Sequence, residues 1–139
     1  MPFKFVEDIA MADVAFEATG KTLKELFESS ASAAIESMAN PKTVKPKIKK
    51  TFKKKAKDID GLLFEFIEEL IYLKDRFAIV FHDVKVTVDE KKMTVQAVIT
   101  GDKIQPEKQE LRQDVKAVTM HYYTVVKKKY WKANVVLDI

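Results

Sequence analysis

Cysteine is absent from this 139-residue sequence, and glycine and histidine are scarce. Without cysteine the chain can form no disulfide, no thiolate nucleophile and no Cys-ligated metal centre. Three isolated glycines, at positions 20, 61 and 101, cannot build a glycine-rich phosphate loop. The two histidines, His82 and His121, belong to no zinc-binding motif. These absences predict that the protein is not a freestanding enzyme.

Long hydrophobic runs are also absent. The longest, residues 77–81, is far shorter than the roughly 20 residues that cross a bilayer. The first ten residues lack the basic start and apolar region of a signal peptide. With 47% hydrophobic and 33% charged residues, the composition is that of a folded domain. We therefore expect one soluble, cytoplasmic domain that spans residues 1–139.

Charge is unevenly distributed along the chain. The formal net charge is +4, yet residues 41–57 contain nine lysines and no acidic residue, which leaves −5 for the remainder. Such a segment indicates a polyanionic or acidic partner. Equally, lysines on an edge strand prevent pairing with other sheets. Phe52 is the only aromatic residue among these lysines, so base stacking is not indicated there. We take Lys49, Lys53 and Lys55 as the candidate basic surface.

Hydrophobic periodicity predicts the elements of the first half. Alternation indicates a short strand at 3–5 and a half-buried strand at 12–18. A capping box, formed by Thr22 and Glu25, predicts a helix that begins at about Leu23.

The lysine-rich segment and the residues after it predict a strand and a second helix. Alternating apolar residues indicate a strand at 44–56, and Pro46 favours a sheet edge because it cannot donate to a ladder. The second helix, roughly 59–76, has apolar residues on more than one side, which predicts a central place in the core.

The second half of the chain predicts strands only. Residues 84–99 alternate as a hairpin, and 101–111 form a polar loop. The segment 115–126 is apolar on both faces, which favours a central strand. A basic turn at 127–129 leads into the last strand, 131–139. The order predicts an α+β fold, a two-layer single domain with two helices packed on a mostly antiparallel sheet.

Two aspartates lie on the outward faces of strands. Asp13 alternates with core residues of its strand, and Asp138 alternates with those of the last strand. If the first and last strands are adjacent, both side chains would converge with a terminal carboxylate at Ile139. Three such groups would repel unless a cation lay between them, and oxygen ligands suit Ca²⁺ or Mg²⁺. The alternative is that both aspartates are simply solvated.

Five segments, taken in order, resemble motifs of a single family: Glu7–Val14, Gly20–Leu23, Leu62–Leu70, Val115–His121 and Val135–Ile139. The family is that of the archeases. The strand Val-Lys-Ala-Val-Thr-Met-His and the ending Val-Val-Leu-Asp-Ile are the most specific matches. The sequence departs from the family at Ala10 and Met11, where His-Thr is usual, and at Gln109, where a histidine is usual. Direct action of those histidines would predict a weaker activity here or a diverged partner.

The resemblance implies a small chaperone-like cofactor that is not itself an enzyme. Archeases activate the RtcB-type tRNA-splicing RNA ligase by promoting its guanylylation and multiple turnover. The family is also associated with chaperoning a tRNA cytosine methyltransferase. Its metal site, usually described as calcium, maps onto Asp13, Asp138 and Ile139.

Two further residues, Lys116 and His121, match the family's strand motif. By strand parity they lie on opposite faces. We expect Lys116 to be a buried lysine that needs a carboxylate partner and therefore acts beside Asp13 and Asp138. We expect His121 to support the fold. The competing hypothesis is a tRNA-binding module that uses the lysines of 42–57 as its contact surface.

Overall fold

The computed structural model describes residues 2–6 and 13–139. Its elements follow in the order β1 (Phe3–Val6), β2 (Asp13–Gly20), α1 (Leu23–Met38), the 3-10 turn η1 (Pro41–Thr43), β3 (Ile48–Lys55), α2 (Ile59–Phe77), β4 (Ile79–Asp89), β5 (Thr94–Lys103), β6 (Ala117–Lys127) and β7 (Trp131–Asp138). No helix in the described ranges is long and apolar enough to cross a membrane.

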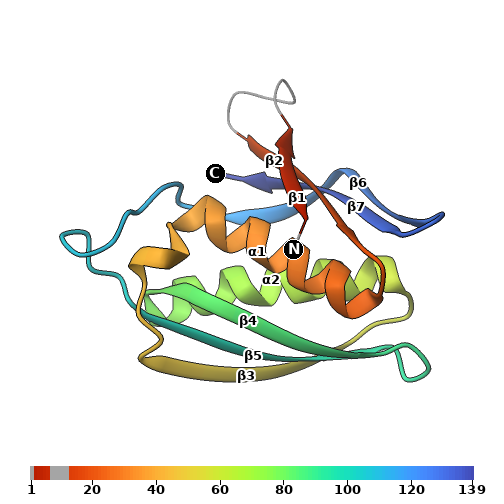
Figure 1. Cartoon of the computed structure of the whole chain (residues 1–139), viewed down its shortest axis with the longest axis horizontal. Helices are drawn as coiled ribbons and strands as arrows, with labels where there is room; N and C mark the ends of the chain where they lie inside the picture. Colours follow the sequence, from red (N-terminus) through yellow and green to blue (C-terminus); the bar gives the residue numbers. More distant parts are fainter. Residues whose placement is uncertain (1, 7–12) are drawn as a thin grey trace.

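The two helices lie between two antiparallel sheets (Figure 1). One sheet has the strand order β1-β2-β7-β6 and the other the order β3-β5-β4. The predicted α+β class, with two helices packed on antiparallel strands, is confirmed. The strands form two sheets with the helices between them, and not one sheet covered by helices on one face. The reason is that α2 is apolar around most of its circumference, so it is covered on both sides.

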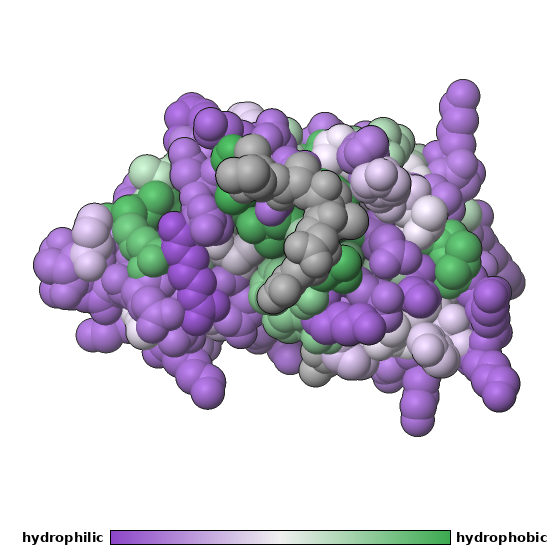
Figure 2. Space-filling view, turned by 90° about the horizontal axis from the view of Figure 1, so that it is seen from above, coloured by the Kyte–Doolittle hydropathy of each residue, from purple (hydrophilic) through white to green (hydrophobic). Residues whose placement is uncertain are grey.

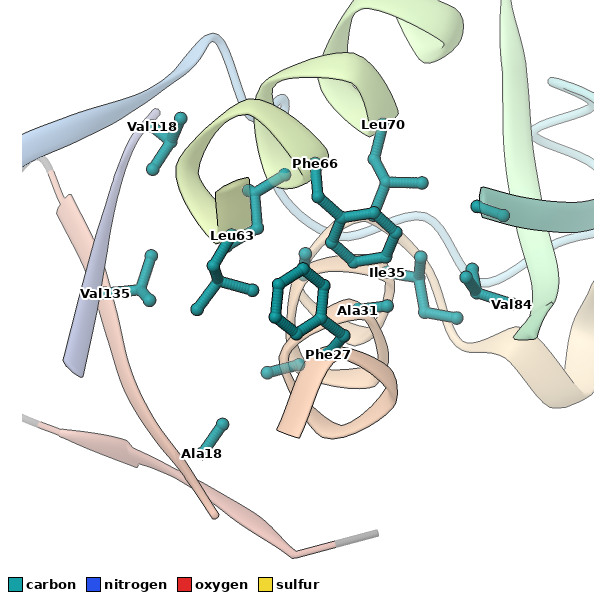
Figure 3. Close-up of a cluster of buried hydrophobic side chains, with 14 of the residues drawn as sticks. Ala18, Phe27, Ala31, Ile35, Leu63, Phe66, Leu70, Val84, Val118 and Val135 are labelled. Carbon is teal, nitrogen blue, oxygen red and sulfur yellow. The ribbon is translucent and has the colours of Figure 1, made fainter. Parts of the chain in front are cut away.

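The core fills the space between both sheets and the helices. Phe27 of α1 and Phe66 of α2 pack with ring centroids 5.4 Å apart. Figure 3 shows Val135 on one side of this pair and Val84 on the other, so one hydrophobic cluster joins the two sheets through the helices. The predicted central position of the second helix is confirmed.

The predicted cap of α1 is present. The Glu25 main-chain N–H donates to the Thr22 hydroxyl at 3.2 Å, and the Lys21 N–H donates to the Glu25 carboxylate at 2.8 Å. The first bond satisfies an N–H group that the first helical turn would otherwise leave without a partner, and the second ties the residue before the cap to the helix.

Replacing Thr22 with alanine should lower the free energy of unfolding by about 1 kcal/mol, because the Glu25 N–H loses its acceptor. Urea denaturation measures the loss. The matched control is Thr22→Ser, which keeps the hydroxyl and should cost only a few tenths of a kcal/mol. Equal losses in both variants would show that the threonine methyl group, not the cap, matters.

The lysine-rich strand lies at a sheet edge, as predicted, but it is shorter than its alternation suggested. β3 begins at Ile48, so Pro46 lies outside it. Before it, Asn40 caps η1 by accepting from the Lys42 N–H at 3.1 Å, and the Val44 N–H returns to the Pro41 carbonyl at 3.1 Å. Residues 41–44 therefore form a turn, and β-strand pairing begins only at Ile48.

The prediction that 115–126 is a central strand is wrong. Among the described residues, β6 is an edge strand that pairs only with β7, and β7 takes the interior place. Between Thr119 and Thr124 the register shifts by an irregularity, and Tyr122 within it has a φ of 57°. The outward apolar residues of β6 therefore stay exposed, although their composition resembles that of a strand covered on both faces.

Candidate functional site

Asp13 and Asp138 lie directly opposite one another. β2 and β7 pair antiparallel, and these two residues are partners in the register. Their neighbours Val14 and Leu137 face inward and pack in the core, so both carboxylates belong to the outward face. Figure 1 shows the carboxyl end of the chain beside the start of β2. The predicted pairing of these strands is confirmed.

The electrostatics of this pair are unfavourable without a counterion. Like charges directly opposite across two strands destabilise a sheet. Within residues 2–6 and 13–139, no ammonium or guanidinium forms an ion pair with either carboxylate. The same ranges hold no group of three or more acidic, histidine or cysteine side chains suited to a metal. The donors are nevertheless all oxygen, which fits a hard cation such as Ca²⁺ or Mg²⁺.

The end of β7 is held in place from two directions. The side chain of Ile139 is half-buried and packs against the core. The Asp138 carbonyl accepts the main-chain N–H of Lys116 at 2.8 Å, and Ala117 is the partner of Asp138 on β6. Lys116 is therefore adjacent to the acidic pair through its backbone.

The expectation of a buried Lys116 is wrong, because its side chain is exposed. The buried lysine at this end is Lys74, in the last turn of α2, which is 6% exposed. Its ammonium lies 2.8 Å from carboxylate oxygens of both Asp75 and Asp114. Lys74 follows Leu70 by one helical turn, and that spacing was the sequence signal for its burial.

The ion pairs of Lys74 change the pKa values of two groups. Burial alone lowers the pKa of Lys74, but hydrogen bonds to Asp114 and Asp75 outweigh it and raise that pKa above 10.5. The hydrogen bond from Lys74 lowers the pKa of the Asp114 carboxyl below 3.8, with a smaller contribution from the charge of Lys116. Because Asp114 lies two residues before Lys116, this contact anchors the segment that leads into β6.

His121 lies apart from the acidic pair, within the irregular part of β6. Its side chain is exposed and its ring lies 4.1 Å from the ring of Tyr122. Its main-chain N–H donates to the Thr119 hydroxyl at 3.0 Å. The parity that placed it opposite Lys116 does not apply, because the register shift comes between Thr119 and Thr124.

Gln109 is buried and organises the loop between β5 and β6. Its side-chain N–H donates to the Lys103 carbonyl at 2.9 Å, and its side-chain oxygen accepts from the Gln105 N–H at 2.8 Å. In this chain the position therefore supports loop structure. Ala10 and Met11, the other two departures, lie outside the described residues.

The three predicted surface lysines alternate along β3 and face solvent. Lys49, Lys53 and Lys55 are exposed, and none has a carboxylate within ion-pair distance in the described part of the chain. The lysines between them are engaged elsewhere. Lys54 lies 3.1 Å from Glu69, and the ammonium of Lys50 lies 3.8 Å above the ring of Phe77.

Comparison with known proteins links the chain to one family over nearly its whole length. The model of the archease protein family matches residues 3–139. Protein archease of Pyrococcus furiosus is 34% identical over 132 residues, which cover 92% of this chain and 93% of the relative. Protein archease of Sulfurisphaera tokodaii is 35% identical over 138 residues, 99% and 98% of the two chains. The solution structure of protein 1598 of Methanobacterium thermoautotrophicum matches with a TM-score of 0.84 and 32% identity, covering 99% of this chain and 98% of that one.

Proposed function

Because this chain belongs to the archease family, we propose that it is a non-catalytic protein cofactor of an RtcB-type tRNA-splicing RNA ligase in the cytoplasm. It promotes guanylylation of the ligase and repeated turnover. The observation that carries the proposal is the outward pair Asp13 and Asp138, two directly opposed carboxylates without an ion-pair partner in the described ranges.

The acidic pair acts as a divalent-cation site in this proposal. Asp13 and Asp138, with a main-chain oxygen of Ile139, supply hard oxygen ligands for Ca²⁺, with Mg²⁺ as the alternative. A bound cation offsets the repulsion between the opposed carboxylates. Lys116, exposed beside Asp138, is available to contact the ligase, and its backbone is held by the Asp138 carbonyl.

A multiple-turnover ligation assay tests the proposal. Purified cognate ligase is given excess RNA substrate, with and without substoichiometric amounts of this protein. We expect product per ligase molecule to rise well above one only when the protein is present, and the guanylylated fraction of ligase to rise with it. Unchanged turnover with a guanylylation-competent ligase would refute the proposal.

A second function, binding of tRNA directly or as chaperone of a tRNA-modifying methyltransferase, is favoured by the lysine surface of β3. The exposed ammonium groups of Lys49, Lys53 and Lys55 are available for phosphates. Counterion release by such contacts predicts steep salt dependence with little sequence preference.

Replacing these three lysines with glutamine should slow association with tRNA and lower the salt slope of binding by about one unit per lost phosphate contact. Maximal ligase stimulation should survive, because the acidic pair is unchanged. Titrations over a salt series measure both. The control variant replaces Lys21, Lys85 and Lys108, which are exposed elsewhere. Equal slopes for wild type and the β3 variant would leave the lysines as protection of the sheet edge.

A further inference from the structure

A second lysine cluster surrounds the turn between β6 and β7. No acidic residue occurs from 115 to 137, a stretch that contains five lysines. Lys128 donates its main-chain N–H to the Tyr130 carbonyl at 3.1 Å, which closes the turn and displays the side chains around it. Figure 1 shows this turn and the β4–β5 turn at the same end of the molecule.

The turn borders a hollow on the protein surface. Its wall combines long basic side chains with exposed apolar ones: Val126, Lys128, Lys129, Tyr130, Lys132 and Asn134. Tyr130 is 48% exposed and Val126 is 43% exposed. Figure 2 shows long hydrophilic side chains projecting at this end, on the right, beside a hydrophobic patch. An exposed aromatic ring thus lies among lysines, which the lysine strand β3 does not provide.

The positive charge of the hollow is only partly neutralised. Lys132 lies 3.4 Å from Glu17, and the ammonium of Lys127 lies 5.5 Å from the ring centroid of Trp131. Lys128 and Lys129 have no carboxylate within ion-pair distance among residues 2–6 and 13–139. Two ammonium groups beside an exposed ring therefore face solvent.

We propose that this hollow binds single-stranded nucleic acid, with one base stacked on Tyr130 against Val126 and phosphates held by Lys128 and Lys129. Aromatic rings stack any base without sequence preference, and lysines contact phosphates as point charges. An acidic protein surface would engage the lysines but would leave the ring and the valine without a matching planar ligand. The stacking ring is separate from the acidic pair, since Tyr130 and Asp138 flank opposite ends of β7, roughly 25 Å apart.

Fluorescence anisotropy with labelled single-stranded oligouridylate tests this site on the whole protein without any ligase. Tyr130→Ala should weaken binding about 5- to 150-fold at unchanged salt slope, whereas Tyr130→Phe keeps the stacking surface and should bind like wild type. The double variant Lys128→Gln/Lys129→Gln should lower the salt slope by about 1.4. The matched control, Lys42→Gln/Lys108→Gln, makes the same charge change at two exposed lysines in η1 and the β5–β6 loop and should leave affinity nearly unchanged.

Several results would overturn the proposal. If the wild-type protein shows no affinity for the oligonucleotide at low salt, the proposed binding site is refuted. Equal binding by wild type and Tyr130→Ala removes the stacking contact, and equal weakening by the two lysine variants leaves only general attraction by charge. Displacement of the oligonucleotide by polyglutamate at equal charge would assign the hollow to an acidic protein. A comparison with oligodeoxythymidylate distinguishes RNA from DNA as the ligand. Weaker binding of the DNA oligonucleotide would indicate contact with the ribose 2′-hydroxyl.

Discussion

Asp13→Asn should abolish both divalent-cation binding and ligase stimulation while the fold is kept. The side chain lies on the outward face and makes no ion pair in the described ranges, so nothing in the core depends on its charge. Without cation, the variant should be as stable as wild type or more stable by about 0.2–1 kcal/mol, because the repulsion from Asp138 is removed.

Thermal unfolding with and without Ca²⁺ separates the roles of Asp13. At a concentration 100 times its Kd, the cation should stabilise wild type by about 2.7 kcal/mol and should not stabilise the variant. Glu90→Gln, an exposed carboxylate in the β4–β5 turn, is the matched control and should behave as wild type in both assays. A variant that still responds fully to Ca²⁺ would exclude Asp13 as a cation ligand, and a variant that unfolds would instead indicate a structural role for its side chain.

The predicted contribution of Ile139 needs a different change, because the proposed ligand there is a main-chain oxygen and not a side chain. A chain that ends at Ile139 should bind Ca²⁺ more tightly in calorimetry than one extended by a short Gly-Ser tail. Equal affinities would remove Ile139 from the site and leave its half-buried side chain as a packing contact.

The double variant Asp75→Asn/Asp114→Asn should lower the free energy of unfolding by about 1–3 kcal/mol, because it leaves the buried side chain of Lys74 without a charged partner, although solvent screens the two exposed carboxylates. Each single variant should cost much less, since one carboxylate remains 2.8 Å from the ammonium in either case. Urea denaturation measures all three.

Adding Lys74→Met to the double variant tests whether the loss of stability comes from the unpaired charge of Lys74 or from the loss of other contacts. Methionine has a similar length and no charge, so adding it to the double variant should restore most of the lost stability. Failure of this rescue would show that the two aspartates act through other contacts. The double variant should also loosen the segment 114–116 that leads into β6, which links stability here to the position of Lys116.

The same pair predicts a pH dependence of stability. The pKa of Asp114 is lowered by Lys74, so its contribution is present above its ordinary pKa of 3.8 and is lost as the pH falls below it. The pKa of Lys74 is raised above 10.5, so its contribution persists up to that pH and is lost above it. Lys74→Met should flatten both limbs of the stability curve.

The sequence by itself determined the local elements and the faces of the strands. The predicted cap Thr22 accepts from an N–H group three residues ahead, a contact within a single turn, and in the structure Asp58 makes the same contact in α2. Alternation placed Asp13 and Asp138 on outward faces, and the ending Val-Val-Leu-Asp-Ile indicated the family. These features depend on residues close together in the chain.

Only the tertiary structure decided which strands are neighbours and which side chains are buried. Alternation shows which residues share a face, but an edge strand with an exposed apolar face, such as β6, has the same composition as a central one. The spacing from Leu70 puts Lys74 on the buried face of α2, but its carboxylate partner Asp114 lies 40 residues further along. The organising role of Gln109 likewise depends on carbonyl and N–H groups of a folded loop. Such contacts form between residues that only the packed chain brings together, so no local pattern encodes them.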